Sequence, residues 1–285
     1  MDQLVAWITD NKVPVGDWMA AIVEFIKDNT LSLFDIIAAS ISFVVDGFTG
    51  ALEWVPEPIL IVVLVAATYA LRRSWPLALF VAFALLFVLN QGYWTETMET
   101  LTLVLFATLA SALIGVPLGI AAAHRPWLYQ ALRPVLDLMQ TLPTFVYLLP
   151  TLVLFGLGTV PGLISTVIFA LPAPVRLTHL GITSVPRPLI EAGEAFGATK
   201  RQLLWKVELP AARATIFAGI TQCIMLSLSM VVIAALVGAG GLGVPVVRAL
   251  NQVKVGMGFE AGFAIVLVAI ALDRVCRPAE KNLPR

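Results

Sequence analysis

The chain has 285 residues with equal numbers of acidic and basic side chains; 59% of its residues are hydrophobic and only 13% are charged. Soluble domains carry roughly 25% charged residues, and the mean hydropathy here is +0.93, so the composition predicts an integral membrane protein. The zero net charge leaves no electrostatic footprint for nucleic acid.

Residues 1–55 form an N-terminal segment that differs from the rest of the chain. Apolar residues recur at helical spacing between Leu31 and Leu52. Acidic and hydroxyl side chains recur on another face, at Asp35, Ser42, Asp46, Thr49 and Glu53. This pattern predicts an amphipathic helix lying on the membrane beside a protein neighbour. The distribution of basic residues, described below, places this segment on the extracytoplasmic side. A true membrane span over the same residues is the alternative.

From residue 56 onward, apolar runs follow one another, most of them near the length that a bilayer requires. We expect helices over Pro58–Leu71, Pro76–Trp94, Met98–Ala123, Val135–Leu157, Val160–Leu177, Thr215–Val237 and Gly258–Asp273. The fold class predicted is therefore all-α, with about seven transmembrane helices. Two peripheral helices lie within 56–97, a core of five occupies 98–275, and a tail covers 276–285.

The distribution of Lys and Arg predicts the orientation of these helices. Alternating crossings place most of the basic residues on one side and leave only Lys12, Lys27, Arg248 and Lys254 on the other. By the positive-inside rule, the C-terminal tail is cytoplasmic and the N-terminus lies outside.

The longest polar interruption in the second half is residues 187–210, on the cytoplasmic side. Pro188 can open a helix, Gly197 can end it, and Thr199 with Gln202 has the spacing of a capping box. Pro210 closes the stretch at the first turn of the next apolar run. We expect a short helix, a glycine turn and a second short helix. Such an element suits docking into a groove on a partner that moves the attached helices; a merely structural loop is the alternative.

Intramembrane chemistry is not indicated by the sequence. The predicted spans carry almost no ionisable residue near their centres, which disfavours an ion-driven pump. There is no Walker A motif, so any ATP must be hydrolysed by a separate chain. We expect no catalytic residue, cofactor or metal.

A glycine-rich run follows the 215–237 helix. It formally matches a dinucleotide-binding motif, but it follows a membrane helix rather than a strand. We interpret Gly238, Gly240, Gly241 and Gly243 as a flexible break or gate.

Two sets of residues resemble a known family. Glu191-Ala192-Gly193, Gly197 and Val207–Pro210 match the spacing of the EAA motif of bacterial ATP-binding-cassette importer permeases. Gly193 stands where the motif has a second alanine, and Val207 where it has isoleucine. The stretches Leu136–Tyr147, Phe169–Pro172, Leu226–Ile233 and Gly238–Gly243 resemble permeases for glycine betaine, proline betaine and choline. Ala123–Tyr129 and Cys223 look most like the choline-type members.

The resemblance implies a five-helix type I (MetI-like) core in the bacterial inner membrane, working as a homodimer. Each copy would dock on a cytoplasmic ATPase subunit through its EAA loop, and a separate extracytoplasmic binding protein would deliver a quaternary ammonium compound. The coupling positions carried over are Glu191, Ala192, Gly193, Gly197, Leu209 and Pro210. Alternatives are a same-fold permease for trimethylamine oxide or methionine, and a secondary transporter that works alone.

Candidate pathway-lining residues are Phe145, Tyr147, Met225 and Ser229. Aromatic faces can attract a quaternary ammonium ion. Packing within the bundle or anchoring at the membrane interface is the alternative role for such side chains.

Overall fold

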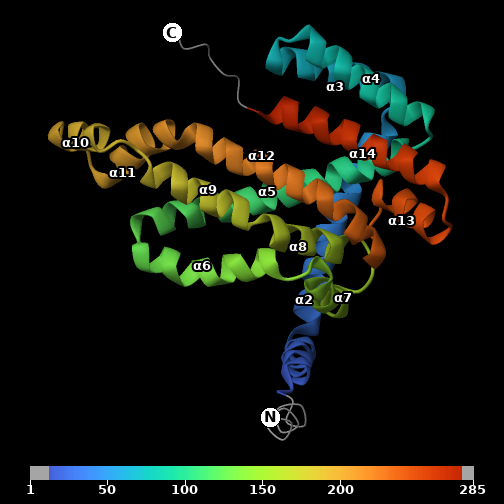
Figure 1. The fold of residues 1–285 in the computed structure, drawn as a ribbon, viewed down its shortest axis with the longest axis horizontal. Coiled ribbons are helices and arrows are strands. Elements are labelled where there is room, and N and C mark those ends of the chain that lie inside the picture. Colours follow the sequence, from blue (N-terminus) through green and yellow to red (C-terminus); the bar gives the residue numbers. More distant parts are fainter. Residues whose placement is uncertain (1–12, 278–285) are drawn as a thin grey trace, which may run out of the picture.

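The computed structural model describes residues 13–277, and within that range the chain is helical without any β-strand (Figure 1). The α-helices before the polar interruption are α2 (Val15–Trp54), α3 (Glu57–Arg72), α4 (Trp75–Asn90), α5 (Trp94–His124), α6 (Pro126–Thr141), α7 (Thr144–Phe155), α8 (Thr159–Ala170) and α9 (Pro172–Thr183). Those that follow are α10 (Arg187–Ala195), α11 (Lys200–Leu203), α12 (Leu209–Ala234), α13 (Gly243–Asn251) and α14 (Val255–Cys276). A π-helical segment, η1 (Leu204–Glu208), joins α11 to α12, and a 3-10 turn, η2 (Ala235–Val237), follows α12.

The membrane class is confirmed by the lengths and hydropathy of these helices. Among the described residues, five helical stretches are long and apolar enough to cross a membrane: Val15–Trp54, Trp94–His124, Thr159–Thr183, Lys200–Val237 and Val255–Cys276. The two peripheral helices expected within 56–97 form as α3 and α4. Each has 16 residues and so spans only about 24 Å. They pair with each other, and α4 packs on α14.

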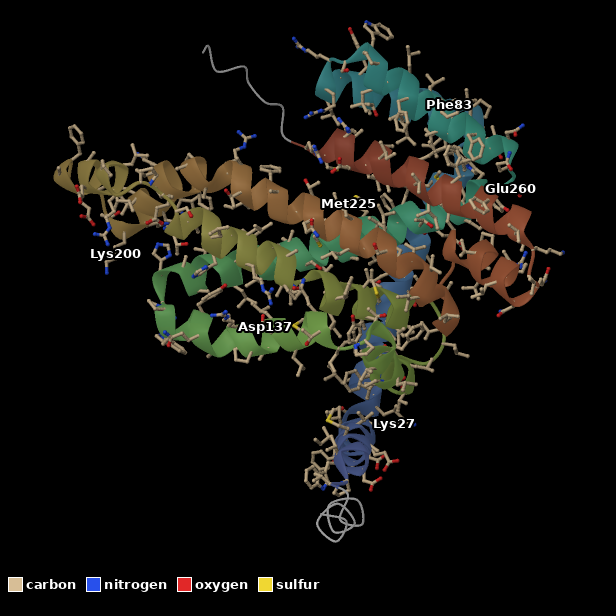
Figure 2. The ribbon with its side chains drawn as sticks, in the orientation of Figure 1. Lys27, Phe83, Asp137, Lys200, Met225 and Glu260 are labelled. Carbon is tan, nitrogen blue, oxygen red and sulfur yellow. The ribbon has the colours of Figure 1, made fainter. Side chains whose placement is uncertain are left out.

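The expected single helix over Val135–Leu157 is wrong, because the chain bends by 96° between α6 and α7. Leu142 adopts an extended conformation there, and Pro143 follows it. A residue before proline is pushed out of the helical region by steric clash, so the apolar run is divided between two helices. On α6, Asp137 (labelled in Figure 2) accepts a hydrogen bond of 2.6 Å from Arg176 of α9.

The centre of the bundle is formed by α5, α8, α9 and α12, which contact one another extensively. Small residues let two of these helices approach closely. A Cβ on Gly115 of α5 would lie 2.8 Å from Pro174 of α9, and one on Gly119 would lie 2.6 Å from Thr178. In a membrane the hydrophobic effect does not drive helices together, because lipid tails are as apolar as the side chains. Close backbone approach of this kind stabilises helix association through van der Waals contact.

The N-terminal helix α2 runs across the direction of α5, α12 and α14 rather than alongside them (Figure 1). Its Val45 is buried in the main hydrophobic cluster, and the helix departs from helical geometry at Thr30. The helix expected between Leu31 and Leu52 is therefore confirmed. Its orientation on or across the membrane stays a prediction, and the first twelve residues and the tail after Arg277 lie outside the described residues.

The bundle has two opposite ends. One carries α10 and α11 and is called the α10 end; the other carries α13 and is called the α13 end (Figure 1). Helix α5 begins near the α13 end and finishes toward the α10 end, whereas α12 runs in the opposite direction.

Candidate functional site

The α10 end carries the helix–turn–helix element expected between residues 187 and 210. Pro188 lies in the first turn of α10. The N–H of Gly197 donates to the carbonyl of Glu194 at 2.9 Å, and the N–H of Ala198 donates to that of Gly193 at 3.1 Å. With Gly197 at φ = 75°, these bonds form a Schellman motif. The glycine turn predicted from the sequence is confirmed.

The second helix starts at the predicted capping box. The backbone N–H of Gln202 donates to Oγ1 of Thr199 at 3.3 Å, and the N–H of Thr199 donates to Oε1 of Gln202 at 2.8 Å. The helix does not stop before Pro210, however. It continues through η1 into α12, so that Lys200–Val237 is one helical stretch of 38 residues. No loop therefore separates α11 from α12.

The surface of α10 is divided between packing and solvent. Gly193 faces the second helix, where an added Cβ would lie 2.7 Å from Cδ1 of Leu203. Glu191 and Ala192 are exposed, as is Lys200, labelled at this end in Figure 2. Phe196, which sequence reasoning passed over, is 93% exposed at the tip of the turn. An apolar side chain so exposed at a tip is a feature of contact surfaces.

A polar contact links the base of this element to another helix. Nε2 of His124, the last residue of α5, lies 2.9 Å from Oε2 of Glu208 in η1, and Nδ1 of His124 lies 2.9 Å from the carbonyl oxygen of Ile120. Glu208 is buried, so His124 supplies the partner that a buried carboxylate requires. The sequence gives no signal for this pair, because its members lie 84 positions apart.

The glycine loop, residues 238–243, lies at the α13 end against the start of α5. The N–H of Gly241 donates to Oε2 of Glu99 at 2.6 Å, and the N–H of Leu242 donates to Oγ1 of Thr100 at 2.8 Å. Thr100 is fully buried and donates its own hydroxyl to the carbonyl of Glu96. The hydroxyl is thus oriented so that its free lone pairs face the loop.

Glycine is required in this loop by close approach and by backbone conformation. Gly238 and Gly241 have φ values of 87° and 108°. A Cβ on Gly240 would lie 2.5 Å from the carboxylate of Glu99, and one on Gly243 would lie 2.3 Å from the carbonyl oxygen of Val231. Whether the loop opens as a gate stays a prediction; in this structure it is a tightly packed turn.

A polar cavity of about 280 Å³ adjoins the glycine loop. Its lining includes Asp46, Thr49 and Glu53 from the acidic face of α2, together with Glu99 and Gly240. Glu99 was not singled out from the sequence. Its contact with the loop could not be found from local patterns, because Glu99 and Gly241 are 142 positions apart.

The four candidate pathway residues fall on two separate surfaces. On α7, Phe145 is 56% exposed whereas Tyr147 is buried. On α12, Met225 (labelled in Figure 2) and Ser229 are exposed. Met225 lines a cavity of about 500 Å³ with Gln222 and Asp273, and neither Phe145 nor Tyr147 is part of that lining. Their roles stay predictions.

These features define a helical membrane protein that displays a folded helix pair at one end. Comparison with known proteins then identifies the family. Residues 115–275, more than half of the chain, match the family described as binding-protein-dependent transport system inner membrane component. The chain belongs to this family of membrane permeases.

Relatives within the family are similar over most of the chain. The glycine betaine transport system permease protein OpuAB of Bacillus subtilis is 49% identical over 80% of this chain and 81% of its own length. The glycine betaine/proline betaine permease ProW of Escherichia coli is 44% identical over 83% of this chain and 66% of its own length. A trimethylamine N-oxide transport system permease of Ruegeria pomeroyi is 38% identical over 74% of this chain and 32% of its own length. A choline transport system permease of Bacillus subtilis is 36% identical over 57% of this chain and 69% of its own length.

Solved structures support the fold. A methionine transporter, MetNI, in an inward-facing conformation has a TM-score of 0.56 and 24% identity, covering 67% of this chain and 96% of its own. At this identity the likeness concerns the fold alone, and it agrees with the expected MetI-like architecture.

Proposed function

We propose that the chain is the transmembrane subunit of an ATP-binding-cassette importer that moves a quaternary ammonium compound, with glycine betaine, proline betaine and choline as candidates, into the cytoplasm. The observation that carries the proposal is the α10–α11 element. It has the EAA spacing, is folded as two short helices joined by a glycine turn, and continues without a loop into the long helix α12. The betaine permeases at 44–49% identity supply the substrate class.

ATP hydrolysis belongs to a separate cytoplasmic subunit in this proposal. The exposed face of α10 is the surface offered to it, with Glu191 and Ala192 on the helix and Phe196 at the tip. Gly193 and Gly197 shape the turn, while Leu209 and Pro210 begin α12. Because α11 and α12 are continuous, displacement of α10 by the ATPase would move α12 as a rigid body.

The remaining partners follow from the same assignment. The α10 end and the C-terminus lie in the cytoplasm, and the α13 end with the N-terminus lies outside, as the positive-inside rule favours. A binding protein captures the solute outside and docks at the α13 end. A second copy of the chain completes the pathway within the inner membrane. In a single copy, Gln222, Met225 and Ser229 are exposed on one face of α12, and the second copy would cover this face.

Within this pathway the glycine loop is the gate nearest the outside. The loop has no bulky side chain between Gly238 and Gly241. A small movement of its backbone would therefore widen or narrow the pathway for the solute. The candidate residues that line the pathway are Phe145 and Tyr147 on α7 and Met225 and Ser229 on α12. The two pairs come together in one pathway only when two copies of the chain assemble.

The competing substrate is trimethylamine N-oxide, because permeases for it are 38–40% identical to this chain. It shares the trimethylated nitrogen of glycine betaine and choline, and it carries an N-oxide oxygen where they carry a carbon chain. Methionine has no comparable support, because the methionine transporter shares the fold only.

The test is ATP hydrolysis by the complete importer reconstituted in lipid vesicles with its ATPase and binding protein. Glycine betaine, proline betaine, choline and trimethylamine N-oxide are added separately at matched concentrations. We expect the betaines or choline to stimulate hydrolysis. Stimulation by trimethylamine N-oxide alone would overturn the substrate assignment while leaving the importer assignment intact.

A further inference from the structure

A cavity of about 490 Å³ lies between the turn that joins α3 to α4 and the C-terminal half of α14. This volume falls within the range of about 300–1,000 Å³ that is usual for ligand pockets. Within the described part of the chain, the cavity is lined by no acidic residue. Its lining combines two arginines and a serine with apolar side chains: Arg72, Ser74, Arg274, Leu77, Phe80 and Ile270. The cavity therefore offers both positive charge and apolar surface to an occupant.

The positive charge of the cavity is not neutralised by a neighbouring carboxylate. Asp273 is paired with Arg277, whose Nε lies 3.1 Å from Oδ2 of the aspartate. Neither Arg72 nor Arg274 forms an ion pair with another residue of 13–277. One guanidinium nitrogen of Arg72 donates to the backbone carbonyl of Arg277, which positions the side chain. A guanidinium group has five N–H donors, so both arginines keep donors for an anion.

The start of α4 adds further donors at the same place. Ser74 precedes the helix, and its side chain makes no capping hydrogen bond. The first turn of a helix has unpaired N–H groups and a partial positive charge. Since α4 has 16 residues, its N-terminus reinforces the arginines in favouring a negatively charged group such as a phosphate.

The surroundings of the cavity are those of a membrane–water interface. Helices α3 and α4 lie at the edge of the bundle beside α14 (Figure 1). Trp75 is 64% exposed, and its ring centroid lies 4.4 Å from that of Tyr69. Exposed tryptophan and tyrosine side chains are typical of the headgroup level of a bilayer. Leu77, Phe80 and Ile270 are not buried, so they remain available to an apolar chain.

We propose that this cavity binds an anionic phospholipid. Its phosphate lies at Arg72 and Arg274, and one acyl chain lies along Leu77, Phe80 and Ile270. Basic pockets between membrane helices recognise anionic headgroups in this way. The bound lipid joins the α3–α4 turn to α14 and so holds the peripheral helix pair on the bundle. The inference does not depend on which solute the chain transports.

Two other ligands would use only part of this site. A free phosphate ion would satisfy the arginines and leave the apolar lining uncovered. A zwitterionic phospholipid would fill the apolar part but would bring a positive ammonium group close to the arginines. An anionic phospholipid satisfies both parts, so it should bind more tightly than either.

The test is native mass spectrometry of the full-length chain, stripped of lipid in detergent and titrated with phosphatidylglycerol or with phosphatidylcholine of the same acyl chains. We expect tighter binding of phosphatidylglycerol. Arg274→Ala should weaken it by about fivefold, the effect of one basic side chain near an anionic lipid surface. Arg72→Ala combined with Arg274→Ala should weaken it by about 25-fold if the two effects are independent. Unchanged affinity in the double variant would overturn the inference.

Matched variants separate the site from general effects of charge and folding. Arg125→Ala removes an exposed arginine at the end of α5 that does not line the cavity, and it should bind phosphatidylglycerol as the wild type does. An equal loss in this variant would contradict a defined site. Arg72→Ala also removes the bond to the Arg277 carbonyl. If it folds poorly, the deciding pair is Arg274→Ala against Arg274→Lys, which keeps the charge and should retain most of the affinity.

Thermal unfolding of the same protein distinguishes the possible ligands. Phosphatidylglycerol should raise the unfolding temperature of the wild type more than phosphatidylcholine does, and Arg274→Ala should remove that difference. Inorganic phosphate at the same concentration should give no shift. A shift with inorganic phosphate as large as that with phosphatidylglycerol would indicate an anion site without a lipid and overturn the inference. If Arg274→Ala instead separates two copies of the chain and leaves lipid binding unchanged, the surface is an interface between copies and the inference fails.

Discussion

The two ends of the molecule are built on different principles. At the α10 end, the helix pair is shaped by local bonds: the capping box joins residues three apart, and the Schellman motif joins residues three and five apart. At the α13 end, the glycine loop is held by side chains 142 positions away. An element made of local bonds can move as a unit and keep its shape. The glycine loop has local backbone bonds as well, but it also depends on the distant ones, so it changes when α5 moves relative to α12.

The largest expected effect is on docking at the α10 end. Glu191→Lys reverses a charge on the exposed face of α10 and should weaken binding of the ATPase subunit by about 100-fold, as an unfavourable charge at an interface does. The amount of permease in the membrane should not change. Co-purification of the ATPase with tagged permease measures the effect. Glu57→Lys, the same change at an exposed site on α3, serves as the control, and equal loss in both variants would contradict a docking role.

The next effect concerns the stability of the loop at the α13 end. Gly241→Ala forces a φ of 108° on a residue with a Cβ that would lie 2.6 Å from Oγ1 of Thr100. We expect a loss of about 2 kcal/mol in the free energy of unfolding, the scale of backbone strain of this kind. Thermal unfolding in detergent measures it.

Gly262→Ala is the matched control for the loop variant. This glycine lies within α14 and has no atom within 4 Å of an added Cβ, so alanine should stabilise by about 0.5–1 kcal/mol through helix propensity. An unchanged unfolding temperature in Gly241→Ala would show that the loop is not the packed turn described.

A smaller effect is expected at the tip of the α10–α11 element. Phe196→Ala should weaken the ATPase complex by about tenfold, because it removes an apolar side chain available for burial at the interface. The unfolding temperature of the isolated permease should stay the same, since Phe196 is 93% exposed there. Binding measured by titration of the ATPase onto immobilised permease checks this, and full affinity would place Phe196 outside the contact.

The smallest effect should come from Gly193→Ala, which restores the residue usual in the EAA motif. The added Cβ meets only Cδ1 of Leu203, the end of a flexible side chain. A shift of less than about 1 kcal/mol in stability is expected, together with normal uptake, because the leucine can change its rotamer. Loss of uptake would mean that the element tolerates no displacement between its two helices.

Features formed by local bonds could be predicted from the sequence, whereas features formed by distant bonds could not. The helix ends at Gly197 and Thr199 were predicted correctly, because Schellman motifs and capping boxes leave residue signals within a few positions. The membrane class followed from hydropathy alone. The bend at Pro143 was missed because an apolar run continues across it, although the proline gave a signal that could have been used.

Other features left no usable signal. The pairing of His124 with Glu208 and of Glu99 with Gly241 depends on helix packing over 84 and 142 positions. The continuity of α11 with α12 was hidden because Pro210 suggested a break, yet proline is tolerated in the first turn of a helix. Helix α13 was not among the predicted helices, because its nine residues are too few to give the apolar run of a membrane span.

The central claim is that this chain transports only when a separate ATPase drives it. The most direct measurement is uptake of labelled glycine betaine into vesicles that contain either the chain alone or the chain with its ATPase, binding protein and ATP. The account predicts uptake only in the complete, ATP-supplied system. Uptake at the same initial rate by the chain alone, without ATP, would contradict it.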